Sequence, residues 1–128
     1  KDFFNQYYTI YQNANEYPAL IPQVYLHYDP HARTWRGSNV VYTHQRMDFL
    51  MLLPNGIRVV IEIDGKQHYS EGDISSPKLY AEMMVDTRKL QLKGYEVYRF
   101  GGYEFMDSQQ MKQTVRDFFE MLFKKYSI

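Results

Sequence analysis

Apolar residues recur every three or four positions at both ends of the chain. In the first 13 residues, KDFFNQYYTIYQN, this spacing predicts an amphipathic helix. The segment 106–126, MDSQQMKQTVRDFFEMLFKKY, has the same spacing and predicts a final helix. The inward-facing residues of that last helix are then Val115, Phe118, Phe119 and Leu122.

Between these helices the pattern changes to that of strands. The segment 24–28, VYLHY, is rich in strand-favouring residues and predicts a first strand. The segments 46–53 (RMDFLMLL) and 57–64 (IRVVIEID) flank Pro-Asn-Gly at 54–56. A three-residue hairpin loop commonly has glycine at its last, left-handed position, so these two segments are predicted to form a β-hairpin.

A second helix and a fourth strand follow the hairpin. Ser76 is a suitable N-cap, Pro77 suits the first helical position, and Gly94 is a typical helix stop, so a helix is predicted between them. The segment 95–100, YEVYRF, predicts a short strand. The order helix, three strands, helix, strand, helix indicates a single α/β domain over 1–128, with a mixed sheet of about four strands flanked by helices.

The register of the hairpin brings two acids together. If Leu53 pairs with Ile57, then Asp48 lies directly opposite Glu62. Carboxylates opposed in this way have Cβ atoms about 4.5–5.5 Å apart and are normally destabilising. A divalent cation would compensate for this repulsion. The same register predicts one wholly apolar face made by the pairs Met47 with Ile63, Phe49 with Ile61, and Met51 with Val59.

A third carboxylate extends this acidic set. Asp64 lies two residues beyond Glu62 and therefore points to the same face of a regular strand. Three hard oxygen donors suit Mg²⁺ or Mn²⁺. Such an ion polarises a phosphate oxygen and lowers the pKa of a bound water, so Asp48, Glu62 and Asp64 predict phosphodiester hydrolysis.

Three polar residues after the acids are candidates for assisting this chemistry. Lys66 would position the water or neutralise charge on the phosphate. Gln67 and His68 would hydrogen-bond a phosphate, and His68 would also relay a proton to the leaving oxygen.

The structural alternative is a solvent-exposed acidic hairpin whose carboxylates pair with Arg46, Arg58 and Lys66. The opposite face of the hairpin is apolar as well, because it carries Leu50, Leu52 and Val60. Acids at the edge of a covered face are more typical of a cleft.

The segments RMDFL, VVIEIDGKQHY and LQLKGYEVYRF, in this order, resemble the PD-(D/E)XK nuclease superfamily, especially its very-short-patch-repair-like branch. The resemblance spans roughly residues 45–100 and implies a restriction-endonuclease-like core, with Asp48 and Glu62 binding magnesium. At the third motif position Asp64 stands where the family has lysine, and Lys66 restores the lysine only in a shifted register. We favour Glu62 and Asp64 as ligands.

The resemblance also suggests residues that would support the site. It implies an accessory acid from the first helical region, for which Glu16 is the candidate, and phosphate contacts from Arg88, Lys89 and Arg99. The structural alternative for the cations of the second helix is that they stabilise its C-terminal end.

Composition sets the remaining bounds. Lysine plus arginine and aspartate plus glutamate number 15 each, so attraction to nucleic acid must come from local patches. The chain has no cysteine, which excludes thiolate and cysteine-zinc chemistry and makes the cytoplasm the expected compartment. No apolar run approaches the ~18 residues of a membrane span. A start at Lys1 leads us to expect a domain of a longer protein with further domains.

These observations predict a magnesium- or manganese-dependent endonuclease acting on DNA, with RNA not excluded. The resemblance implies a role in bacterial defence, restriction or repair. The main alternative is a catalytically degenerate module of the same fold that binds nucleic acid or a protein partner. A non-nuclease interaction domain with a solvated acidic hairpin ranks last.

Overall fold

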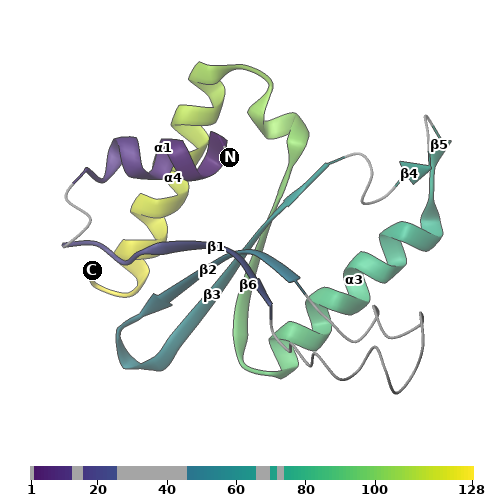
Figure 1. Ribbon diagram of the computed structural model, residues 1–128, viewed down its shortest axis with the longest axis horizontal. Coiled ribbons are helices and arrows are strands. Elements are labelled where there is room, and N and C mark those ends of the chain that lie inside the picture. The colour runs from purple at the N-terminus through teal and green to yellow at the C-terminus, as the bar shows by residue number, and fades with distance from the viewer. Residues whose placement is uncertain (1, 13–15, 26–45, 66–69, 72–73) are drawn as a thin grey trace.

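The structure is a computed structural model that describes residues 2–12, 16–25, 46–65, 70–71 and 74–128 (Figure 1). Four strands form one mixed sheet in the order β1-β2-β3-β6. Neighbours β1 and β2 are antiparallel, as are β2 and β3, whereas β3 and β6 are parallel. The strands are β1 (Leu20–Tyr25), β2 (Arg46–Leu53), β3 (Ile57–Asp64) and β6 (Tyr95–Gly101).

Helices flank this sheet, as the sequence predicts. Helix α1 (Asp2–Ile10) and helix α4 (Ser108–Lys125) lie side by side, and α3 (Pro77–Leu92) lies on the other side (Figure 1). A short ladder between β4 (Ser70–Glu71) and β5 (Ile74–Ser75) precedes α3 and was not expected. The predicted α/β class with a four-stranded mixed sheet is confirmed.

The hairpin and the second helix begin and end where their local residues require. The 3-10 turn Pro54–Gly56 joins β2 to β3, with φ of 67° at Asn55 and 75° at Gly56. Ser76 caps α3, because its Oγ accepts the N–H of Leu79 at 3.2 Å. Gly94 follows α3 with φ of 95°, the left-handed conformation that glycine adopts at low cost.

The first strand begins earlier than the predicted segment 24–28. It starts at Leu20 and contains Pro22, which precedes the predicted segment. Proline is tolerated here because β1 is an edge strand of the sheet. Residues 26–28 of the predicted strand lie outside the described residues.

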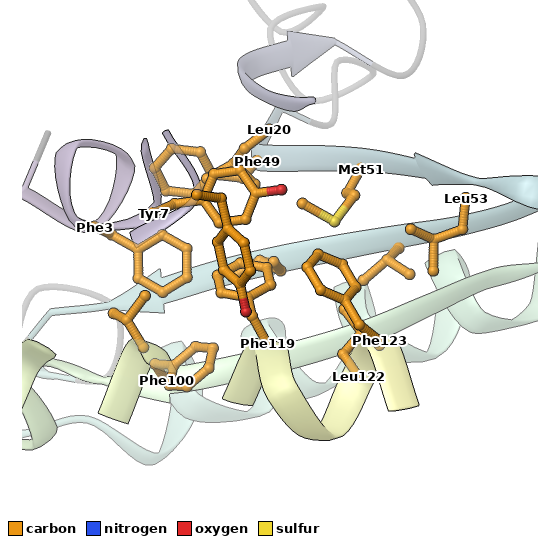
Figure 2. Close-up of a cluster of buried hydrophobic side chains, with 14 residues drawn as sticks. Phe3, Tyr7, Leu20, Phe49, Met51, Leu53, Phe100, Phe119, Leu122 and Phe123 are labelled. Atoms are coloured by element: carbon orange, nitrogen blue, oxygen red, sulfur yellow. The ribbon is translucent and has the colours of Figure 1, made fainter. Parts of the chain in front are cut away.

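The main core lies between the sheet and the pair α1 and α4. It contains 14 buried residues, many of them aromatic, and Figure 2 shows them converging from both layers. The rings of Tyr7 and Phe119 lie 4.6 Å apart between their centroids, and those of Phe3 and Phe49 lie 5.3 Å apart. Val115, Phe119 and Leu122 are buried as predicted, while Phe118 is partly buried.

A smaller cluster of Met47, Val60 and Leu90 joins the sheet to α3. Met47 was expected on the face of Phe49, and that prediction is wrong. Between the pairs Pro22–Phe49 and Val24–Met47, the ribbon of β1 and β2 changes the face that it presents to each layer. Phe49 packs in the main core, whereas Val24 and Met47 pack in the smaller cluster. Gln23, between Pro22 and Val24, has φ of 53°, a left-handed conformation that reverses the alternation of faces.

No helix in the described part of the chain is long and apolar enough to cross a membrane.

Candidate functional site

The two strands of the hairpin change their mode of pairing at the acids. Paired positions run from Leu53 with Ile57 to Phe49 with Ile61, which is the predicted register. Beyond these pairs, side-chain oxygens accept the hydrogen bonds that join the two strands. The backbone N–H of Asp48 donates to Glu62 Oε2 at 3.3 Å, and the N–H of Ile63 donates to Asp48 Oδ2 at 3.0 Å. The structure therefore brings Asp48 and Glu62 together, as expected, through bonds from side chain to backbone.

The Glu62 carboxyl group lies in an environment that favours its neutral form. Its residue is only 8% exposed. Burial, with further contributions from the hydrogen bond to the Asp48 carboxyl group and from that group's charge, raises the pKa of Glu62 to about 8, although Arg99 acts in the opposite direction. The pair therefore retains a proton at neutral pH, which a bound cation would displace.

Asp64 is engaged by an arginine from the neighbouring strand. Its side chain is 8% exposed, and its Oδ1 lies 2.7 Å from Arg99 Nη1. The remaining nitrogens of Arg99 bind α3: Nε donates to Thr87 Oγ1 at 2.5 Å and Nη2 to the Met83 carbonyl at 3.2 Å. Arg99 thus joins β3, β6 and α3, so it has a clear structural role.

The expected set of three carboxylates is not assembled as one group. Among the described residues, no cluster of three or more acidic or histidine side chains is placed to hold a metal ion. Asp48 and Glu62 touch each other, whereas Asp64 is paired with Arg99. A role for Asp64 as a metal ligand stays a prediction.

The remaining predicted site residues are not brought into contact with Asp48 and Glu62, or they lie outside the described residues. Lys66, Gln67 and His68 lie outside the described residues, so their roles stay predictions. Arg88 and Lys89 are exposed on α3. Lys89 lies in the last turn of this helix, where a positive charge stabilises the helix by its interaction with the helix dipole. Glu16 is exposed in the turn between α1 and β1.

A cavity of about 790 Å³ opens beside the acidic pair. Asp48 lines it together with Ile63, Gln23 and Arg46, and side chains of α1 supply an apolar wall. Sequence reasoning did not identify Gln23, because a lone glutamine in a strand segment gives no sign of a left-handed backbone. The nearby Arg46 appeared in the sequence only as a possible partner of the acids.

Comparison with models of protein families, with curated proteins and with solved structures finds no match to this chain.

Proposed function

We propose that this chain is a metal-dependent nuclease with a restriction-endonuclease-like fold that hydrolyses phosphodiester bonds in DNA. The observation that carries the proposal is the meeting of Asp48 and Glu62 beyond the last paired positions of β2 and β3, where the carboxyl group of each residue accepts a backbone N–H from the opposite strand. Two acids in such contact repel each other when both are ionised, and a shared divalent cation removes that repulsion. The order of elements in the PD-(D/E)XK superfamily, which the motifs resemble, supports the same conclusion.

The donor set fits Mg²⁺ or Mn²⁺. Both ions prefer oxygen ligands, and Mg²⁺ is commonly held by one or two carboxylates together with water and substrate phosphates. Asp48 and Glu62 supply two carboxylates, of which Asp48 lines the cavity. A bound ion would polarise a phosphate oxygen and lower the pKa of a water molecule, which is the chemistry that phosphodiester hydrolysis needs.

The protein's own groups have defined tasks in this proposal. Glu62 and Asp48 hold the cation, and Glu62 releases its proton when the cation binds. Arg99 fixes the position of Asp64 at the end of β3, two residues after Glu62. Arg46, exposed on the cavity wall, attracts the phosphate backbone. Lys66 and His68 remain the proposed partners of the attacking water and the leaving oxygen.

A second candidate is a module of the same fold that binds nucleic acid without cutting it. The commitment of Asp64 to Arg99 favours this alternative, because it leaves two carboxylates where we expected three. A binding module keeps its affinity for DNA when metal is removed and when Asp48 is replaced by alanine.

Cleavage assays distinguish the two functions. Supercoiled plasmid and single-stranded DNA are incubated with Mg²⁺, Mn²⁺ or a chelator, using wild type, Glu62→Gln and Asp48→Asn. The nuclease predicts metal-dependent cleavage that both variants lose by a factor of about 100 or more, because each removes one of two cation ligands.

The matched control is Glu82→Gln, which makes the same chemical change on the exposed surface of α3. It should cleave like wild type. Absence of cleavage by folded wild type, or equal cleavage by wild type and Glu62→Gln, contradicts the nuclease proposal. Metal-independent binding of DNA without cleavage would establish the binding module instead.

A further inference from the structure

The cavity beside Asp48 combines an apolar, aromatic part with a polar part. Phe4 of α1, Phe49 of β2 and Phe105 before α4 line the first. The second is lined by one arginine, one glutamine and two aspartates: Arg46, Gln23, Asp48 and Asp2. The two parts share strand β2, on which Phe49 directly follows Asp48. A ligand in this cavity would therefore contact an aromatic surface and the candidate site at once.

The size of the cavity suits part of a nucleotide. Its volume of about 790 Å³ falls within the range of about 300–1,000 Å³ typical of small-molecule sites. Aromatic side chains bind nucleobases by stacking, without dependence on sequence. Phe4 is only partly buried, and its ring packs against that of Tyr8, with 4.8 Å between the ring centroids. The ring of Phe4 therefore offers an accessible aromatic surface whose position is fixed by packing.

The polar part of the cavity is arranged for the rest of the nucleotide. Arg46 and Asp48 lie two residues apart on β2 and both line the cavity. An arginine attracts a phosphate, and Asp48 is one of the two proposed cation ligands. A base in the aromatic part would place its own phosphate beside these two residues.

We infer that this cavity holds an unstacked nucleobase of the substrate strand, so that the substrate is single-stranded or locally unpaired nucleic acid. This inference rests on the proposed nuclease function and specifies its substrate. Bases of an intact duplex are stacked inside the helix and cannot enter a cavity unless they are extruded. Intact duplex is therefore a poor substrate, and strands with bases free to leave the stack are good ones.

Binding without cleavage tests the inference separately from the activity. Fluorescence anisotropy in the presence of a chelator compares an oligothymidylate with an abasic oligonucleotide of the same length. Because a stacked base contributes about 1–3 kcal/mol, we expect wild type to bind the oligothymidylate at least about 5-fold more tightly. Phe4→Leu should reduce that preference to about 2-fold or less and leave the abasic affinity unchanged.

Phe118→Leu is the matched control. Phe118 is also a partly buried phenylalanine of the main core, but it lies on α4 against Tyr98 and Phe100. It should retain the wild-type preference. If Phe4→Leu does not fold, photocrosslinking of wild type to an oligonucleotide containing iodouracil replaces it, and the crosslinks should map to the segments containing Phe4 or Phe105.

Equal affinity for the two oligonucleotides, or crosslinks mapped only to other segments, overturns the inference. Faster Glu62-dependent cleavage of intact duplex than of single strands overturns it as well and leaves the nuclease proposal standing. Base-dependent binding lost in Phe4→Leu, without any Glu62-dependent cleavage, contradicts the nuclease and retains the base site.

Discussion

The backbone N–H of Asp48 donates to the Glu62 carboxyl group at 3.3 Å, and the Asp48 carboxyl group in turn accepts the N–H of Ile63, the residue after Glu62, at 3.0 Å. The protonation of Glu62 is therefore linked both to the stability of the hairpin end and to any cation held there. This linkage makes the site accessible to measurements that do not require a substrate.

The first prediction concerns stability as a function of pH. The pKa of Glu62 is raised from 4.5 to about 8 in the folded protein, mainly by burial. Between these values the folded state keeps a proton that the unfolded chain has lost. The free energy of unfolding should therefore fall as pH rises from about 4.5 to about 8, by at most about 1.4 kcal/mol per pH unit.

Urea unfolding of wild type and Glu62→Gln across this range checks the prediction. The variant has no proton to lose at this position, so its stability should exceed that of wild type increasingly toward pH 8. Glu82→Gln controls for the loss of one carboxylate at an exposed position. A difference between wild type and Glu62→Gln that does not change with pH would show that Glu62 does not carry this titration.

The second prediction concerns metal binding. Because Mg²⁺ must displace the proton of Glu62, its affinity should increase with pH by up to about tenfold per unit until about pH 8. Calorimetry in buffers of different ionisation enthalpy measures the protons released with each bound ion. A proton release close to zero at neutral pH would contradict a site built on Glu62.

The third prediction concerns the contact between Arg99 and Asp64. Replacing Arg99 with methionine leaves the Asp64 carboxylate buried without its arginine, and we expect a loss of about 3 kcal/mol in the free energy of unfolding. Adding Asp64→Asn to that variant should restore part of the loss. Arg88→Met, which makes the same chemical change at an exposed position of α3, is the control. If the effects of Arg99→Met and Asp64→Asn on the free energy of unfolding are additive, the two residues are not coupled.

The fourth prediction concerns Gln23, the residue of β1 with a left-handed backbone conformation. Gln23 has φ of 53°, where a β-branched side chain is strained and glycine is not. Gln23→Ile should lower the free energy of unfolding by about 1–2 kcal/mol, while Gln23→Gly should be neutral or stabilising. Gln113→Gly in the interior of α4, at an exposed position, is the matched control and should cost about 1 kcal/mol, measured by the same urea unfolding.

Local signals along the chain predict the hairpin and the helices well. The apolar alternation of β2 and β3, together with Pro-Asn-Gly, determines one register, because a slip by one residue would expose an entire apolar face. Ser76 and Gly94 bound α3 through short-range bonds and backbone conformation. The meeting of Asp48 and Glu62 follows from that register, so this part of the site could be found without a structure.

Other features depend on contacts that periodicity does not contain. Arg99 meets Asp64 only because β6 pairs in parallel with β3. The two residues lie 35 positions apart, and the periodicity of the sequence does not show which strand pairs with β6. Strand β2 changes face between Phe49 and Met47, which breaks the period of two on which the placement of Met47 relied. Pro22 reads as a strand breaker and is tolerated only because its strand lies at the edge.

The two sides of the sheet are held by very different amounts of packing. Among the described residues, 14 buried side chains form the cluster between the sheet and the helices α1 and α4, whereas three, Met47, Val60 and Leu90, form the cluster between the sheet and α3. Amide hydrogen exchange in α3 should therefore report a sub-global opening of lower free energy than that of β3. Arg99 would lose Thr87 and Met83 in such an opening, so cation binding that orders the end of β3 should slow exchange in a helix that supplies no ligand.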